Sequence, residues 1–312
     1  MDAPAPTPLD APEPIARARA FWGDLGLPGL LDVHVHFLPP PIERAVWQVF
    51  DDAGPLIGRE WPIRYRQPVA ERVQLLRDLG VRRFPTLPYA HKPGVATFLN
   101  DWSRTFAAET PEVWWSGTAY PEPDAVDYLA PLVERGLRLV KLHQQVGGYL
   151  LDDRHFDAVW DLLAATGTPV LVHAGSGPVG TEFTGPESLG RVLERWPDLT
   201  VIVAHLGAPE SVAFAEIARR HESVYLDTSM AVSPFFGEHF DPEVVPLLAD
   251  LQPRVLFGSD FPTLPFAYAD QLDALAALGL GEDWLRDVCW HNAAALFDEP
   301  EPVPALQEQT AQ

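Results

Sequence analysis

The chain has 312 residues, 47% of them hydrophobic, so it can bury a sizeable core as one α/β barrel or as two smaller domains. Its 22 basic and 44 acidic side chains give a formal charge of -22, which argues against nucleic acid or an anionic membrane as partner, because basic patches bind both. The single cysteine, Cys289, excludes an intramolecular disulfide. With no signal peptide and no apolar run long enough to span a bilayer, the sequence predicts a cytoplasmic protein.

Both ends of the chain are predicted to lie outside the folded unit. Residues 1–17 are rich in Pro and Ala and contain no apolar segment, which is typical of a disordered tail. Residues 298–312, with Pro and Glu prominent, are predicted to form a second loose tail. The folded unit is therefore expected to cover residues 18–297.

The first predicted strand lies in residues 31–40, which include the stretch DVHVHFLPP. Residues two apart on a strand share a face, so His34 and His36 are expected to point the same way. The prolines at 39–41 end the strand because proline cannot donate to the ladder, which places both histidines at its carboxyl end. A β/α barrel keeps its active site at that end, so two neighbouring imidazoles there favour a metal-binding pair.

A long connection follows, and we expect an irregular insertion at about residues 41–68 before a helical pattern that runs to Gly80. A long connection after a barrel strand usually forms a lid or a wall of the pocket. Arg64 and Arg66 lie in it and are candidates for binding a substrate carboxylate. The alternative for each is a solvated loop charge.

Short apolar runs then alternate with helix-length segments along the rest of the chain. With the opening strand they make eight, the others being 81–87, 113–120, 137–143, 168–174, 199–206, 224–228 and 255–259. Strands alternating with helices predict a parallel sheet, and eight such units favour a closed (β/α)8 TIM barrel. No GxGxxG motif opens a helix to favour a dinucleotide-binding fold.

Chemically active side chains stand at the ends of these runs. They are His34 and His36 on the first run, Lys141 and His143 on the fourth, His173 on the fifth, His205 on the sixth and Asp260 on the eighth. A single strand-end histidine is more often a hydrogen-bonded core residue. Their joint placement at the carboxyl ends indicates a His/carboxylate site for a divalent ion. Asp227 lies on the seventh run, without an evident partner.

The motifs DVHVHFLPP, GLRLVKLH, PVLVHAG, VIVAHLG, LFGSDFP and WHNAAALF resemble the amidohydrolase superfamily over about residues 29–297. The similarity is to its amidohydrolase-related branch, which includes aminocarboxymuconate-semialdehyde decarboxylase, other decarboxylases, hydratases and lactone hydrolases. The resemblance implies that His34, His36, His173 and Asp260 bind one divalent ion, zinc. It also implies that Asp260 and His205 handle protons, and that the protein is a homodimer.

Lys141 and His143 are left with two interpretations each. In two-metal members of the superfamily a carboxylated lysine on the fourth strand bridges the ions, so a carboxylated Lys141 would imply two ions. The alternative is a buried lysine paired with a carboxylate such as Asp32. His143 either lines the pocket or is a strand-end hydrogen-bond donor.

The resemblance and the residues together predict a metal-dependent hydrolase that cleaves a C–O or C–N bond in a small organic acid. The alternative is a non-oxidative decarboxylase of an aromatic or muconate-type acid, which would use the same metal ligands. A non-catalytic scaffold that kept the fold predicts the loss of metal-site groups, but His34, His36, His173, His205 and Asp260 are all present.

Overall fold

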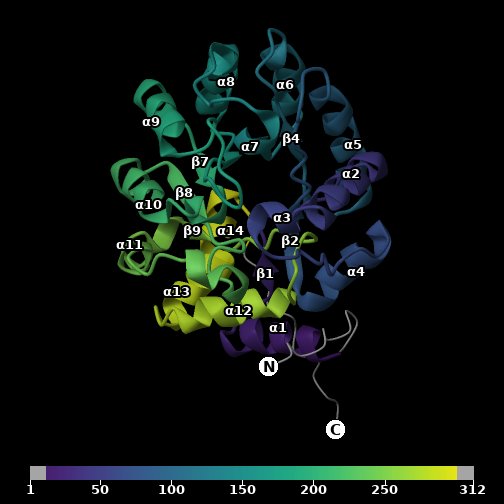
Figure 1. The fold of residues 1–312 in the computed structure, drawn as a ribbon, viewed down its shortest axis with the longest axis vertical. Helices are drawn as coiled ribbons and strands as arrows, with labels where there is room; N and C mark the ends of the chain where they lie inside the picture. Colours follow the sequence, from purple (N-terminus) through teal and green to yellow (C-terminus); the bar gives the residue numbers. More distant parts are fainter. Residues whose placement is uncertain (1–11, 301–312) are drawn as a thin grey trace.

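The computed structural model describes residues 12–300 and shows strands surrounded by a ring of helices (Figure 1). Helix α1, Pro12–Asp24, begins inside the segment predicted to be a tail, so that prediction was wrong for residues 12–17. Residues 1–11 and 301–312 lie outside the described range. Near the other end, Glu299 accepts hydrogen bonds from Arg83 Nε and Trp114 Nε1, so this part of the predicted second tail is bound to the barrel.

The strands pair in parallel throughout, in the orders β1-β2-β3 and β4-β5-β6-β7-β8-β9. Strands β3 and β4 are two parts of the single run predicted at 113–120. The bounds are β1 Leu30–Leu31, β2 Val81–Pro85, β3 Val113–Trp114, β4 Ser116–Thr118, β5 Leu139–His143, β6 Val170–His173, β7 Val201–Val203, β8 Val224–Asp227 and β9 Val255–Leu256. Each predicted run therefore contains a strand or part of one.

Backbone contacts between the first and last runs join the two ends of the sheet. Val35 forms a parallel bridge with Phe261. The Val33 N–H donates to Phe257 O at 3.0 Å, and the His36 N–H donates to Phe261 O at 2.7 Å. These bonds lie where the eighth run of a barrel must meet the first. They support the (β/α)8 architecture expected from the sequence.

Helices α4, α5, α6, α8, α9, α10 and α11 follow one another in chain order around the outside of the strands (Figure 1). Helix α1 packs against α4 and α12, the helices on either side of the seam between the last and first strands. Their bounds are α2 Pro40–Asp51, α3 Gly54–Ile57, α4 Val69–Leu79, α5 Ala96–Glu109, α6 Ala125–Glu134, α7 Gln144–Gly147, α8 Asp157–Thr166, α9 Pro186–Arg195, α10 Ser211–Arg220, α11 Val244–Asp250, α12 Tyr268–Ala277, α13 Glu282–Arg286 and α14 Asn292–Leu296. Within residues 12–300, every helix is too short or too polar to cross a bilayer.

Helix α8 shows how the pattern of apolar residues produces this ring. Val159, Trp160 and Leu163 recur at helical spacing and are fully or almost fully buried in the hydrophobic core. The helix ends at Gly167, whose φ of 65° is a left-handed conformation that glycine adopts without steric cost.

The region after the first strand differs from its prediction in two ways. Strand β1 ends at Leu31, so His34 and His36 lie beyond the regular strand, although still at its carboxyl end. The predicted irregular insertion contains α2 and α3, and prolines expected only to stop the strand also begin α2. Proline suits the first turn of a helix because its missing N–H is not needed there. In Figure 1, α3 lies in front of the strands.

Candidate metal centre

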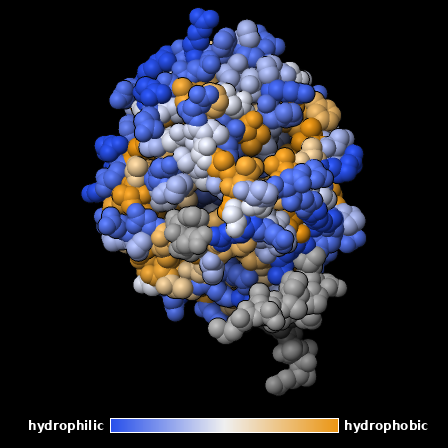
Figure 2. Space-filling model, viewed as in Figure 1, coloured by the Kyte–Doolittle hydropathy of each residue, from blue (hydrophilic) through white to orange (hydrophobic). Residues whose placement is uncertain are grey.

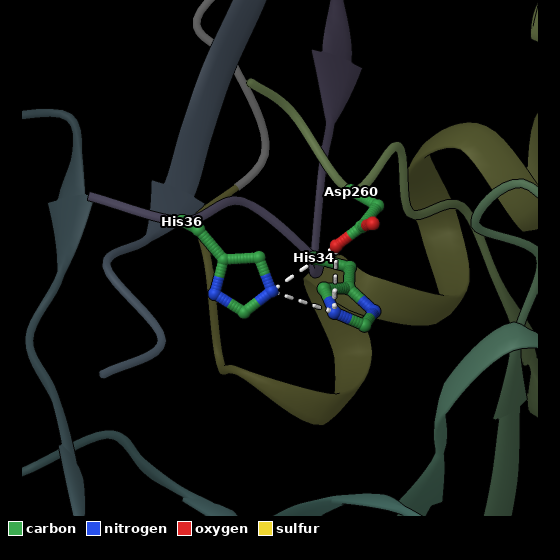
Figure 3. A group of neighbouring side chains, drawn as sticks. All are labelled: His34, His36 and Asp260. Carbon is green, nitrogen blue, oxygen red and sulfur yellow. Dashed lines mark hydrogen bonds and ion pairs between the residues drawn. The ribbon is translucent and has the colours of Figure 1, made fainter. Parts of the chain in front are cut away.

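Three of the predicted ligands meet at the carboxyl end of the barrel. The Nε2 atoms of His34 and His36 are 3.1 Å apart, and Asp260 Oδ1 lies 3.4 Å from the first and 3.1 Å from the second (Figure 3). A tetrahedral zinc ion with ligands at about 2.1 Å holds its donor atoms about 3.4 Å apart. The spacing of this group, which we call the metal group, therefore fits one ion.

The hydrogen-bond partners of the two Nδ1 atoms determine which ring nitrogen of each histidine is unprotonated. His34 Nδ1 is 2.9 Å from Asp227 Oδ2, and His36 Nδ1 is 2.9 Å from the carbonyl oxygen of Leu87. A carboxylate and a carbonyl only accept hydrogen bonds, so each Nδ1 carries the proton. Both Nε2 atoms then direct lone pairs at each other and at Asp260. A cation between them relieves that repulsion, so the donor set fits a metal ion.

The pKa shifts of His34 and Asp260 favour the same protonation state, with a neutral imidazole and a carboxylate. Burial lowers the pKa of His34 well below its ordinary value, and Lys141 lowers it further, so the imidazole is neutral, as a metal ligand must be. Burial alone would raise the pKa of Asp260. The three imidazoles that face this carboxyl group, those of His36, His34 and His205, lower its pKa by more than burial raises it, so Asp260 is a carboxylate at neutral pH.

The backbone around the metal group is unusual in two places. Asp260 has a φ of 68°, a left-handed conformation that non-glycine residues rarely adopt and that is often retained at functional sites. Its N–H donates to His34 O at 2.7 Å, which fixes it beside the first ligand. Behind His34 lies Gly258, where an added Cβ would stand 2.7 Å from His34 Cβ. Only glycine leaves the room that His34 occupies.

His173 lies near the metal group but is oriented differently. Its Nε2 is 2.9 Å from Gly177 O, so in this orientation Nε2 carries the proton. Its ring stacks on that of His143, with centroids 4.0 Å apart and an interplanar angle of 11°. This contact follows from the register, which pairs the two residues across β5 and β6. The metal group in the described chain therefore comprises His34, His36 and Asp260, without His173.

His205 stands beside the metal group, with its ring centroid 4.8 Å from those of both His34 and His173. Its Nδ1 is 2.9 Å from Ser229 O, so Nδ1 carries the proton and Nε2 is unprotonated in the neutral ring. His34, His205 and Asp227 also lie close enough to resemble a second ion site. Protons between His34 Nδ1 and Asp227, and between His205 Nδ1 and Ser229, make it a hydrogen-bonded network instead.

Lys141 is fully buried, with Nζ 3.4 Å from His34 Nε2. Burial lowers its pKa to about 8, although Asp227 and Asp260 oppose the change. Lys141 is buried, as the alternative predicted, but Asp32 is not its partner: Asp32 accepts hydrogen bonds from Tyr268 OH and two backbone N–H groups, and the carboxylates that act on Lys141 are Asp227 and Asp260. Lys141 thus faces the metal group.

The two candidate arginines are anchored in the segment after α3. Arg66 is exposed, and its Nη1 donates to Asp51 Oδ2 at 3.0 Å, with its guanidinium 5.5 Å from the Trp47 ring. Arg64 is partly buried, and its backbone N–H donates to Leu264 O at 2.9 Å. The ion pair with Asp51 places the Arg66 charge at the surface, as the alternative of a solvated loop charge predicts.

A small cavity of about 10 Å³, enough for one water molecule, adjoins the metal group. It is lined by His36, Leu38, Glu43, Val46, Trp47, Tyr89, Pro262 and Thr263. Helix α2 contributes Glu43, Val46 and Trp47, so this helix covers the mouth of the barrel. Figure 2 shows apolar residues gathered near the middle of this face, in the region of α2 and α3, where Val49 and Leu56 are exposed.

Sequence reasoning missed how two residues of the β8 end take part. Asp227 was singled out without a partner, and the structure gives it His34, 193 positions away in the chain. Ser229, which was not predicted, has its Oγ 3.0 Å from His34 Nδ1 and 2.8 Å from His205 Nδ1. The one available signal was the position of Asp227 at a strand end, and nothing comparable pointed to Ser229.

Comparison with known proteins identifies the family and the fold of the chain. A family model described as amidohydrolase matches residues 31–298. Among the curated proteins none matches the chain. Three solved structures with similar folds illustrate the range of related proteins, and their low identities to this chain show the fold alone.

An uncharacterized TIM-barrel protein from Bordetella bronchiseptica has a TM-score of 0.70 at 18% identity. The superposition covers 86% of this chain and 98% of the Bordetella chain. The 5-carboxyvanillate decarboxylase from Novosphingobium aromaticivorans, solved with manganese and 4-hydroxy-3-methoxy-5-nitrobenzoic acid, scores 0.60 at 16% identity, with coverage of 88% and 97%. A Pseudomonas putida protein proposed to be a 2-pyrone-4,6-dicarboxylic acid hydrolase scores 0.59 at 18% identity, with coverage of 88% and 99%.

The family model covers far more than half of the chain and includes every strand-end residue discussed above. It confirms the resemblance found in the sequence motifs, and the similar folds confirm the TIM-barrel prediction. This protein therefore belongs to the amidohydrolase family and is an enzyme of that superfamily.

Proposed function

We propose that this enzyme is a metal-dependent hydrolase that uses water to cleave a C–O or C–N bond, in a lactone, ester or amide of a small organic acid. The observation that carries the proposal is the metal group. Two unprotonated Nε2 atoms and a carboxylate oxygen lie 3.1 to 3.4 Å from one another, an arrangement that calls for a cation.

His34, His36 and Asp260 would hold one divalent ion, with His173 as a fourth ligand. In that role His173 would give up its hydrogen bond to Gly177. Three imidazoles and one carboxylate suit zinc, which we propose as the metal, although the similar Novosphingobium structure contains manganese. When bound, the ion supplies a Lewis acid and lowers the pKa of water to near neutrality.

Asp260 and His205 would move the protons of the reaction. Asp260 is a carboxylate at neutral pH and can accept a proton from the attacking water. His205 has its Nδ1 proton held by Ser229 O, so its free Nε2 can take up a proton and then donate it to the leaving group. Neither role requires a residue outside those already near the metal group.

The cavity beside the metal group favours hydrolysis over decarboxylation. Its lining in the described chain includes Glu43, whose carboxylate pairs with Arg72, but no arginine or lysine, and Arg66 pairs with Asp51 at the surface. These lining residues therefore offer no cation that could bind a second carboxylate of the substrate. The decarboxylases among the similar structures keep the alternative of an aromatic-acid decarboxylase testable.

The test is to incubate the metal-loaded enzyme, in water labelled at oxygen, with two panels of substrates. One panel holds lactones, esters and amides, and the other holds aromatic and muconate-type acids. Hydrolysis predicts the solvent label in the product. Carbon dioxide release without that label would overturn it in favour of decarboxylation. Metal analysis of the same sample should find one ion per chain, and two ions with a carboxylated lysine would assign Lys141 as a bridge.

Matched variants test the assigned residues. His34→Ala and Asp260→Asn should abolish turnover and leave the circular dichroism spectrum unchanged, because each removes one donor of the metal group. His155→Ala is the control, since His155 lies outside the site and contacts Asp153. Full activity in either site variant would contradict the roles assigned here.

A further inference from the structure

Asp227 is the point at which the metal group and His205 are connected. Its carboxylate is fully buried at the end of β8. Oδ2 accepts a hydrogen bond from His34 Nδ1 at 2.9 Å. Oδ1 accepts bonds from the backbone N–H groups of His205 and Ser229, each at 3.0 Å, and from the Ser229 hydroxyl. One oxygen thus faces a ring nitrogen, and the other faces three donors.

We propose that Asp227 is a positioning residue that fixes His34 in the Nδ1–H tautomer, so that its Nε2 lone pair faces the metal, and that holds the His205 turn. The inference rests on the proposed metal site but concerns the hydrogen bonds of the chain itself. His205 has a φ of 57°, and the bond from its N–H to Asp227 Oδ1 stabilises this left-handed conformation.

The asymmetry of the donors makes a specific prediction for Asp227→Asn. An asparagine presents one oxygen and one NH2 group. Facing the NH2 group toward His205 and Ser229 would set it against two backbone N–H groups, which can only donate, so the oxygen takes that side and the NH2 group faces His34. His34 Nδ1 must then accept, which moves the ring proton to Nε2, the atom that faces the metal. The same exchange in the serine-protease triad gives the wrong histidine tautomer.

The experiment records histidine side-chain nitrogen spectra of the metal-free protein, which distinguish the two tautomers, and zinc affinity by competition with a chelator. In the unaltered protein, His34 should be the Nδ1–H tautomer. In Asp227→Asn it should become the Nε2–H tautomer, and zinc affinity should fall by about 10- to 100-fold, as expected when the partner of a metal-binding histidine is removed.

Thr228→Val is the matched control. Thr228 is the adjacent residue, is also buried, and its hydroxyl has no hydrogen-bond partner in the described part of the chain. This variant should leave the His34 tautomer and the zinc affinity unchanged. Retention of the Nδ1–H tautomer in Asp227→Asn, or zinc affinity within about twofold of the unaltered protein, would overturn the inference.

Two further outcomes separate this inference from the proposed function. If Asp227→Asn does not fold, the spectrum of the unaltered protein still decides, because an Nε2–H tautomer of His34 there contradicts the role of Asp227. If the unaltered protein binds no metal, the proposed function fails. The tautomers of the metal-free protein and its variant then still support or overturn the positioning role.

Discussion

A buried ion pair joins the helix that covers the barrel mouth to α4, and removing one of its charges should destabilise the fold. Arg72 Nη2 lies 2.6 Å from Glu43 Oε1, and the Arg72 side chain is fully buried. The rings of Phe37 and Trp47 lie 5.2 and 5.5 Å from its guanidinium. Its Nε and Nη1 have no hydrogen-bond partner in the described chain. Glu43 is therefore the group that balances this buried charge.

Glu43→Gln keeps the shape of the side chain and removes its charge. Breaking a buried pair by removing one partner costs about 3–5 kcal/mol, because the remaining charge is left uncompensated. Glutamine can still accept one hydrogen bond, and the Glu43 side chain is 11% exposed, so we expect the lower end, about 3 kcal/mol. Burial already lowers the pKa of Arg72, and Glu43 opposes that change. Without Glu43 this pKa should fall further.

Urea unfolding of the Glu43→Gln variant measures the cost as a change in the free energy of unfolding at constant slope. The companion is the double variant Glu43→Leu with Arg72→Met, which removes both charges and should recover most of the loss. Hydrogen exchange of α2 amides should accelerate in the single variant, because the pair joins α2 to α4. A loss below about 1 kcal/mol, or a double variant as unstable as the single one, would refute the reasoning.

Two further predictions concern the site and the core. Gly258→Ala should weaken zinc binding by about tenfold or more, measured by chelator competition, because its Cβ would stand 2.7 Å from His34 Cβ. Gly190→Ala, where nothing lies within 4 Å, is the control, and unchanged affinity at Gly258→Ala would contradict the steric argument. The second prediction concerns stability at alkaline pH. Burial raises the pKa of Tyr65 to about 12 and that of Tyr268 well above its ordinary value. In the unfolded chain a tyrosine has a pKa of about 10, so below that pH the two buried neutral hydroxyls contribute fully to stability. Above it the free energy of unfolding should fall by up to about 1.4 kcal/mol per pH unit for each tyrosine. Urea unfolding in steps from about pH 9 to 12 measures this, and constant stability above pH 10 would show that both tyrosines ionise freely in the fold.

The positions of the site residues were predictable because a parallel barrel brings all its strand ends to one face. Asp260 is more than 200 positions from His34 and His36, yet the three meet because each stands at the end of an apolar run. The orientation of His173 was not predictable, since it depends on the carbonyl of Gly177 in the following loop. Helix α2 was missed because its prolines indicate a strand end and a helix start equally well.

The hydrogen-bond network around Asp227 was not predictable from the sequence, for a chemical reason. Whether a strand-end histidine offers a lone pair or a proton depends on the acceptor behind it, such as the carbonyl of Leu87 behind His36 or that of Ser229 behind His205. Leu87 has a φ of 38° and His205 one of 57°, so the chain leaves the extended conformation at these strand ends. Sequence periodicity describes extended and helical segments and carries no signal for such single residues. The conformation of a few residues at the strand ends therefore decides which imidazole nitrogens face the metal group.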